Sequence, residues 1–188
     1  MRKVVFVVSL SLDGYIEAAV GDQSWAFPDE ELHRHFNDLE RDIDTHLYGR
    51  RMYELMVDYW PTADQNPSAP AWEVDYAQIW KAVPKVVFSK TFETVNWNSR
   101  LVKGDALAEV ARLKAQLGKN MSVGGVTLAS ALASAGLIDE YRFYYVPILL
   151  GSGKAAFGQL ARRVSLRPIE TRTFKSGTML VRYEPAPS

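Results

Sequence analysis

Apolar residues along the chain follow two periods, which predict its strands and helices. Residues 4–10 form a continuous, mostly β-branched run, typical of a central strand covered on both faces. Residues 169–184 alternate around a Lys-Ser-Gly turn, which predicts an antiparallel hairpin. Further strands are expected in THLYG, PKVVFSKT, MSVG and EYRFYYVPILL, at residues 45–49, 84–91, 121–124 and 140–150.

A helix is expected to begin near Pro28, because an apolar stripe with helical spacing follows this proline. Acidic side chains precede the stripe, at the positive end of the expected helix dipole. Both signals therefore agree on where the helix starts. The stripe consists of Leu32, Phe36, Leu39 and Ile43, and the acidic residues are Asp29, Glu30 and Glu31.

Strands and helices alternate along the rest of the chain. Helices are expected over 105–117, with Gly118 as C-cap, and after the glycine pair at 124–125. The proline-rich residues 59–70 indicate a surface loop. The pattern predicts an α/β fold with a central, mostly parallel sheet and an antiparallel C-terminal hairpin, flanked by helices. The length favours one domain over 1–188, without internal repeats.

The composition narrows the classes of partner. Lys plus Arg equals Asp plus Glu at 22 each, which argues against a nucleic-acid surface or a membrane partner and favours a small molecule. The absence of cysteine excludes disulfides and the cysteine-bearing zinc site of nucleobase deaminases. No metal is expected, since His33 and His35 would point apart on a helix. No apolar run is long enough to span a bilayer, which predicts a cytoplasmic protein.

Three expected strand ends carry residues suited to a dinucleotide. In open α/β sheets, ligands bind beyond the carboxyl ends of strands, where helix N-termini offer unpaired N–H donors and a positive dipole. An arginine pair there can bind a phosphate, including the 2′-phosphate that distinguishes NADP from NAD. Each segment also fits a plain turn or a solvated helix start, but the three together favour a nucleotide. The residues are Gly49, Arg50, Arg51, Ser89, Lys90, Thr91, Gly124, Gly125, Val126 and Thr127.

A competing dinucleotide motif lies further along the chain. GSGKAA at 151–156 matches the G-x-G-x-x-A fingerprint, with Glu170 at a suitable distance. However, Pro147 interrupts the preceding strand, and only a short helix over 155–163 could follow. A two-half Rossmann arrangement does not fit in the remaining residues, so the three strand ends are preferred.

Beyond these patterns, the chain resembles the dihydrofolate-reductase-like superfamily. The resemblance is carried by SLDGYI, LYGRRMYE, YWP, KVVFSKT, VGGVTLASAL, GLIDEY, PILLGSG and SGTMLVRYE, in this order over nearly the whole chain. These segments are most similar to the RibD C-terminal domain family, the reductase domain of the riboflavin-pathway deaminase-reductase. The ordered set is specific, although no single segment is.

The resemblance implies a largely parallel sheet with NADPH lying across its strand ends. It places residues 49–51 at a cofactor phosphate, 89–91 beside the adenosine end, and 124–127 close to the pyrophosphate. Family members transfer hydride from the nicotinamide to a pyrimidine or pterin-like heterocycle, or to the ribose of a phosphoribosylamino-pyrimidine. The cofactor carries the chemistry, and the protein positions it.

Two carboxylates are candidate catalytic residues. Asp13 matches the SLDG position that lies near substrate in the riboflavin branch, and it also fits an Asp-Gly turn. In dihydrofolate reductases a carboxylate begins the helix after a W-x-x-P element, and Trp25 and Pro28 have that spacing here. Direct spacing selects Glu30, whereas a helical wheel favours Glu31, which is adjacent to the apolar stripe.

These observations predict an NADPH-dependent reductase of a small heterocyclic or ribosylamino-pyrimidine substrate, similar to 5-amino-6-(5-phosphoribosylamino)uracil reductase of riboflavin biosynthesis. The alternatives are a dihydrofolate or pterin reductase of the same fold and a non-catalytic nucleotide-binding protein. A homodimer is expected, because the strand at 140–150 and the hairpin could present an edge. Trp25, Tyr53, Trp60 and Phe157 could stack on a planar substrate, although aromatic residues also suit core packing.

Overall fold

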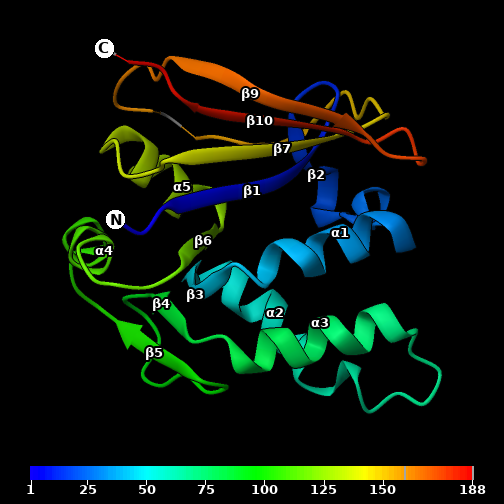
Figure 1. Cartoon of the computed structure of the whole chain (residues 1–188), viewed down its shortest axis with the longest axis horizontal. Coiled ribbons are helices and arrows are strands. Elements are labelled where there is room, and N and C mark those ends of the chain that lie inside the picture. Colours follow the sequence, from blue (N-terminus) through cyan, green and yellow to red (C-terminus); the bar gives the residue numbers. More distant parts are fainter. Residues whose placement is uncertain (159, 188) are drawn as a thin grey trace.

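The computed structural model describes residues 1–158 and 160–187, and an eight-stranded sheet forms its centre (Figure 1). The strand order is β5-β4-β3-β6-β1-β7-β10-β9, and β2 and β8 form a separate pair. The strands are β1 (Val4–Ser11), β2 (Tyr15–Ala18), β3 (Ile43–Gly49), β4 (Lys85–Phe88), β5 (Ser99–Val102), β6 (Asn120–Gly124), β7 (Glu140–Val146), β8 (Gly153–Ala155), β9 (Leu166–Thr173) and β10 (Met179–Pro185). The helices are α1 (Glu30–Glu40), α2 (Arg50–Ala63), α3 (Ala71–Ala82), α4 (Ala106–Lys114) and α5 (Val126–Ser134), with the 3-10 turns η1 (Ala19–Gly21) and η2 (Ser24–Ala26).

The sheet is parallel except at its C-terminal end. β1 lies between β6 and β7 and pairs in parallel with both, which explains its continuous apolar sequence. β10 pairs antiparallel with both β7 and β9, and the turn at 174–178 returns the chain along β9. The amide of Phe174 donates to the carbonyl oxygen of Thr178 across this turn at 2.9 Å. The predicted sheet with its antiparallel hairpin is confirmed.

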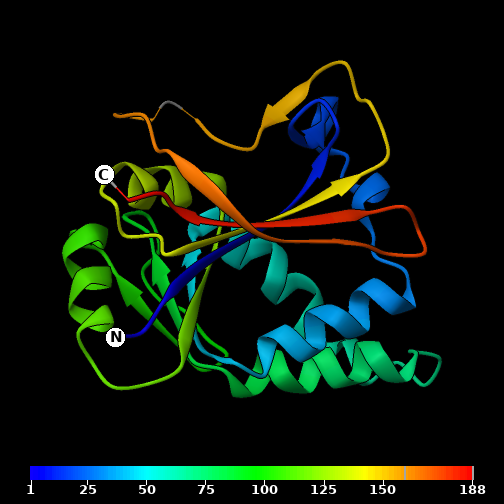
Figure 2. The ribbon, with the colours of Figure 1, turned by 45° about the horizontal axis from the view of Figure 1, so that its top comes forward.

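Helices cover both faces of the sheet (Figure 2). One face, the α4–α5 face, packs against α4 and α5 around buried residues such as Phe6 and Leu132. The opposite α1–α3 face packs against α1, α2 and α3, around Tyr144 and Trp80. The predicted start of α1 is confirmed, since Asp29 is the N-cap and its carboxylate accepts from the amide of Leu32 at 2.9 Å.

The region expected to be a loop at 59–70 is partly helical. α2 continues through Pro61 to Ala63, and α3 begins at Ala71, so only residues 64–70 form the connection. The prediction is wrong here because proline was treated as a breaker. Pro61 lies in the last turn of α2, where it forfeits one backbone hydrogen bond while burying its ring.

Element ends differ from the sequence prediction elsewhere too. Ile43, expected on the stripe of the first helix, begins β3, and the strand expected over 84–91 ends at Phe88. The strand expected over 140–150 ends at Val146, because Pro147 cannot donate to the sheet. The helix expected over 105–117 ends at Lys114, with Ala115 rather than Gly118 at the C-cap. The short strand β5 is absent from the prediction altogether.

The GSGKAA motif forms strand β8 rather than a phosphate loop. β8 pairs antiparallel with β2, and a Cβ on Gly153 would collide with the carbonyl oxygen of Glu17. Close approach of the two strands therefore explains this glycine. Residues 156–158 and 160–163 are not helical, and Gln159 lies outside the described residues, so no fingerprint helix follows.

Candidate functional site

The three predicted strand-end segments lie side by side at one edge of the sheet. β4, β3 and β6 are neighbours and parallel, so their carboxyl ends share this edge (Figure 1). Gly49 is the N-cap of α2, and Gly125 is the N-cap of α5. A Cβ on Gly125 would lie 3.8 Å from the amide nitrogen of Gly49, so the two turns are in contact. The N-termini of α2 and α5 therefore face the same position beyond the strand ends.

The two glycines of the pair serve different purposes. A Cβ on Gly124 would lie 2.8 Å from Cγ of Met52 and 2.9 Å from Cδ1 of Tyr48, so Gly124 permits close packing. Gly125 has room for a Cβ, but its φ of +101° lies where other residues are strained. No side chain of the described residues caps α5, which leaves its first amides available to a ligand.

Arg50 and Arg51 occupy the first turn of α2 and remain exposed. Nη1 of Arg50 lies 2.9 Å from Oε1 of Glu54, an ordinary i,i+4 pair on the helix surface. Nη2 of Arg51 lies 3.9 Å from Oε1 of Glu17, which reaches across from β2. Because such exposed pairs are weak, both guanidinium groups can exchange these carboxylates for a phosphate.

The segment after β4 turns sharply around Ser89. The buried Ser89 hydroxyl accepts from the amides of Thr91 at 3.2 Å and Phe92 at 3.1 Å, and these bonds fix the backbone. Lys90 and Thr91 themselves are exposed at the edge of the sheet. Their side chains are therefore accessible beside the helix N-termini.

A cavity of about 620 Å³ adjoins this edge. It runs between α5 and the segment around β8, and Val126, Thr127 and Leu107 line it together with Lys154 and Phe157. Phe157 also packs edge-on against Phe6, with ring centroids 5.4 Å apart, so it belongs partly to the core. The cavity gives the glycine turn a concave, largely apolar neighbour.

Asp13 joins two loops that lie far apart in the sequence. Its carboxylate accepts from the Ser11 hydroxyl at 2.6 Å and from the amides of Leu150 at 3.2 Å and Gly151 at 2.7 Å. These bonds, led by the Ser11 hydroxyl, lower the pKa of Asp13. At neutral pH Asp13 is therefore a carboxylate that orders loops, and it holds no proton to donate.

Glu31 and two of the aromatic candidates, Trp25 and Tyr53, also make contacts within the protein. Oε2 of Glu31 accepts from the amide of Lys175 at 3.0 Å, which ties α1 to the β9–β10 turn. Trp25 is half-buried in η2, and its indole donates to the carbonyl oxygen of Asp22 at 3.2 Å. Tyr53 is buried, and its hydroxyl is bonded to the backbone of Asn96. A substrate contact by Tyr53 would require that loop to move, so packing is the better interpretation of this residue.

Some residues of this edge escaped sequence reasoning. Glu17 faces Arg51 only because β2 folds back beside β8, and Met52 fills the space beside the glycine pair.

No group of His, Asp and Glu that could hold a metal ion is found within 1–158 and 160–187. The helices in this part of the chain are too short or too polar to cross a membrane.

Comparison with known proteins agrees with this arrangement. Residues 2–180 match the RibD C-terminal domain family. YyaP of Bacillus subtilis (strain 168), an uncharacterized protein, is 32% identical over 186 residues, which cover 97% of this chain and 94% of YyaP. A crystal structure from Shewanella sp. PV-4, of a protein named for riboflavin biosynthesis, has a TM-score of 0.78 at 24% identity and covers both chains fully.

Two more distant structures share the fold. The diaminohydroxyphosphoribosylaminopyrimidine deaminase/5-amino-6-(5-phosphoribosylamino)uracil reductase of Thermotoga maritima has a TM-score of 0.67 at 14% identity, over 98% of this chain and 57% of its own. Dihydrofolate reductase of Enterococcus faecalis, complexed with NADP(H), has a TM-score of 0.64 at 12% identity, over 97% and 96%. The fold is thus of the dihydrofolate-reductase-like class. Within this class, the chain belongs to the RibD C-terminal domain family, which supports a reductase of this fold.

Proposed function

We propose that the protein is an NADPH-dependent reductase that transfers hydride to a small heterocyclic or ribosylamino-pyrimidine substrate. The observation that carries the proposal is the juxtaposition of residues 49–51, 89–91 and 124–127 at the carboxyl edge of β3, β4 and β6. Membership of the RibD C-terminal domain family adds the reductase chemistry. The reaction that serves as a model is that of 5-amino-6-(5-phosphoribosylamino)uracil reductase. The Thermotoga maritima protein carries this activity in its name.

The residues present fit a phosphorylated dinucleotide. The amides from Gly125 to Thr127 would bind the pyrophosphate, because α5 starts without a side-chain cap. Arg50 and Arg51 would bind the 2′-phosphate, and residues 89–91 would border the adenosine. When bound, NADPH supplies the hydride, and the chain orients it and excludes water. The cavity of about 620 Å³ beside Thr127 offers additional apolar surface.

The carboxylates favour a ribosylamino-pyrimidine over a folate. A folate reductase would use an acid at the start of α1, but Glu31 binds the amide of Lys175 there and Glu30 pairs outward with Arg34. Asp13 is ionised and held by loop amides, so it would orient a substrate rather than protonate it. We therefore place dihydrofolate second as an acceptor.

Steady-state assays of NADPH absorbance test the reaction directly. We expect oxidation with 5-amino-6-(5-phosphoribosylamino)uracil and little with dihydrofolate. Activity with dihydrofolate alone would reverse the order of the two substrates. NADPH binding by calorimetry without turnover of any heterocycle in a broad panel would identify a non-catalytic nucleotide-binding protein.

Substitution of Arg50 and Arg51 tests which cofactor the protein prefers. Arg50→Ala combined with Arg51→Ala should weaken NADPH by roughly tenfold to a hundredfold and NADH far less, because charge-assisted hydrogen bonds to the 2′-phosphate are lost. The matched control replaces the exposed Arg34 of α1 and Arg41, the C-cap of this helix, by alanine and should leave both affinities unchanged. Equal weakening of NADPH and NADH would remove the 2′-phosphate assignment.

Substitution of Gly125 tests the proposed binding of the pyrophosphate. Gly125→Val should abolish cofactor binding, because its φ of +101° is strained for valine and the amide cradle would shift. Circular dichroism checks that the variant remains folded. Gly104→Ala is the control, since nothing lies within 4 Å of its Cβ position. Unchanged NADPH affinity in Gly125→Val would reduce the pair to a simple turn.

We also propose that the chain forms a homodimer through the exposed hairpin of β9 and β10. β9 is an edge strand, and most of its residues are exposed. Pro168 has no N–H group and so interrupts the row of backbone hydrogen-bond donors along β9. Two copies would therefore be joined by side-chain contacts rather than by pairing of strands. Sedimentation at micromolar concentration should show a dimer, and a monomer alone would rule this interface out.

A further inference from the structure

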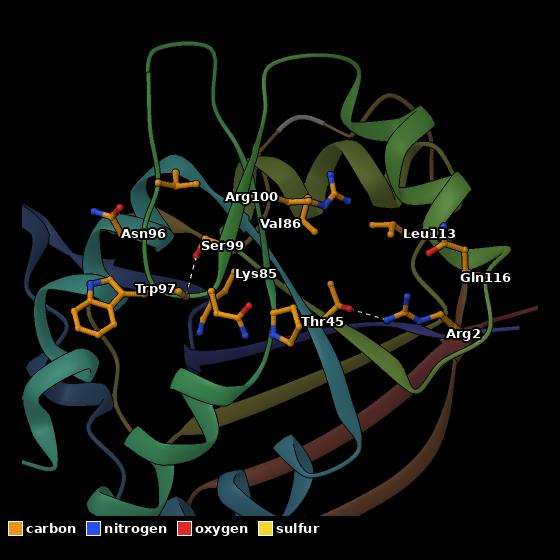
Figure 3. Close-up of a pocket in the computed structure, with 13 residues that line it drawn as sticks. Arg2, Thr45, Lys85, Val86, Asn96, Trp97, Ser99, Arg100, Leu113 and Gln116 are labelled. Carbon is orange, nitrogen blue, oxygen red and sulfur yellow. Dashed lines mark hydrogen bonds between the residues drawn. The ribbon is translucent and has the colours of Figure 1, made fainter.

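A second cavity, of about 480 Å³, lies at the opposite edge of the sheet, where β4 and β5 begin (Figure 3). Because β3, β4, β5 and β6 run parallel, the cavity lies away from the glycine turns, which follow the other ends of β3 and β6. Val86 of β4 and Leu113 of α4 give it apolar walls. Arg2, Thr45 and Arg100 add polar groups. Such a mixture of apolar surface and a few polar groups is typical of small-molecule sites.

Arg2 is a buried side chain with hydrogen-bonding capacity left over. It is 6% exposed, and its guanidinium points toward Thr45 (Figure 3). Nε donates to the carbonyl oxygen of Lys119 at 2.9 Å, and Nη2 donates to Oγ1 of Thr45 at 2.7 Å and pairs with Asp44. Among the described residues Nη1 makes no hydrogen bond, so part of the fork is open to an acceptor.

The charges around the cavity favour an anion. None of its described lining residues is a carboxylate, whereas Arg2 and Arg100 line it. Arg100 pairs with Glu109, but Glu109 also pairs with Arg112, so one carboxylate faces two guanidinium groups. The surroundings therefore retain positive potential.

The wall before β5 is held in an unusual conformation. Trp97 and Asn98 have φ values of +59° and +54°, which are uncommon for residues other than glycine. Asn98 is fixed on both sides: its amide side chain donates to the carbonyl oxygen of Ala82 at 2.8 Å, and its own carbonyl accepts from Lys85 at 2.9 Å. Strained backbone persists where neighbours enforce it, and it clusters at binding sites. The cavity wall is thus rigidly supported.

We propose that this cavity binds a small organic anion, a carboxylate on an apolar body. The carboxylate would lie on the side of Arg2, Thr45 and Arg100, and the body would pack against Val86 and Leu113. This site is separate from the proposed cofactor edge and does not depend on the reductase assignment.

NMR titration of the isotope-labelled full chain tests the proposal with sodium benzoate and with benzamide, its neutral analogue of similar size. Benzoate should shift the amides of residues 85–86 and 98–100 in a saturable way, and benzamide should bind about tenfold more weakly because it lacks the charge. Equal affinities would overturn the anionic part of the proposal. The absence of saturable shifts at these residues with benzoate would overturn the site itself.

Arg100 and Arg112 give a matched pair of variants, since both contact Glu109 and only Arg100 lines the cavity. Arg100→Met should weaken benzoate several-fold, whereas Arg112→Met should not. Equal weakening would reveal general charge attraction and overturn the site. Arg2→Met should weaken benzoate further, but Arg2 also holds Lys119, so the Arg100 comparison carries the test if this variant unfolds. Inorganic phosphate binding as tightly as benzoate would overturn the role of the apolar walls.

Discussion

The two faces of the sheet bury different kinds of side chain. The α4–α5 face is filled by hydrocarbon and aromatic groups, such as Phe6, Met121 and Leu132, all at most 1% exposed. The α1–α3 face buries ionisable groups as well, including His46 and Lys85. The centre of the first face is stabilised by the packing of apolar side chains, whereas the second face also buries groups whose protonation changes with pH.

The polar centre of the α1–α3 face is a pair formed by Glu40 and His46. Oε2 of Glu40 lies 3.6 Å from Nε2 of His46, and neither atom has a hydrogen-bond partner among the described residues. Nδ1 of His46 lies 2.7 Å from the Ser122 hydroxyl. Burial raises the pKa of Glu40 to about 7 and lowers the pKa of His46 to about 3. Below about pH 7 the pair therefore holds its proton on Glu40.

The largest effect is expected from a cavity in the α4–α5 face. Leu132→Ala should lower the free energy of unfolding by about 2–5 kcal/mol, because Leu132 is fully buried and its methyl groups leave a void. Chemical denaturation at about pH 5 and about pH 8 should give the same loss, since no proton is involved. The fully exposed Leu117→Ala is the control and should stay within about 0.5 kcal/mol of the parent protein. A strongly pH-dependent loss would contradict the contrast between the faces.

The second effect is a titration on the α1–α3 face. The pKa of Glu40 rises from 4.5 to about 7 on folding, so the folded state binds more protons than the unfolded state in this interval. The contribution of Glu40 to stability should be largest below pH 4.5 and fall by about 3 kcal/mol as pH rises through about 7. Glu40→Gln should flatten this fall in pH-resolved thermal unfolding. Asp38→Asn, exposed on the same helix, should not, and an unchanged slope in Glu40→Gln would refute the assignment.

A smaller effect is expected from the lysine of the same face. Lys85 is 1% exposed, its ammonium donates to the carbonyl oxygen of Trp80, and burial lowers its pKa to about 8. The unfolded state then binds more protons between pH 8 and 10.5, so stability should rise with pH there. Lys85→Met should remove this rise and stabilise the protein by about 1 kcal/mol at neutral pH. Lys103→Met, at the surface, serves as control, and destabilisation by Lys85→Met would show that its hydrogen bond outweighs its desolvation.

The smallest effect compares one serine on each face. Ser122→Ala removes the hydroxyl beside His46, and Ser130→Ala removes the acceptor of the Gly158 amide at 3.1 Å. Each should cost about 1 kcal/mol. Only Ser122→Ala should also alter the pH dependence of unfolding, because only Ser122 contacts the titrating pair. Identical pH profiles for the two variants would mean that the hydroxyl does not influence where the proton resides.

Sequence patterns predicted the parts of the fold that depend on local signals. β1, the start of α1 and the β9–β10 hairpin follow from a continuous run, an N-cap and a turn. The strand ends at the proposed cofactor edge were predicted for the same reason. α3 was missed because apolar residues surround AWEVDYAQIWKA on several sides and a proline-rich stretch precedes it. Without α3, the burial of Glu40 could not be anticipated.

Long-range contacts were equally hidden from the sequence. The hydrogen bond between the Asp13 carboxylate and the amide of Leu150 joins residues 137 positions apart. The contact of Arg51 with Glu17 requires β2 to pair with β8. Short elements of three or four residues, such as β5 and β8, carry too few positions for a period to be recognised. The positions of the strand ends were therefore easier to predict than the contacts of the side chains around them.

The central position of β1 has a consequence for synthesis on the ribosome. β1 leaves the exit tunnel before the other strands of the sheet, yet its partners β6 and β7 follow more than 100 residues later. Until Gly124 has emerged, the nascent chain carries an apolar strand with both edges unpaired, and the edge that pairs with β7 stays open until Val146 follows. Stalled or truncated chains that end before β6 should therefore be the forms most prone to aggregate and most dependent on chaperones.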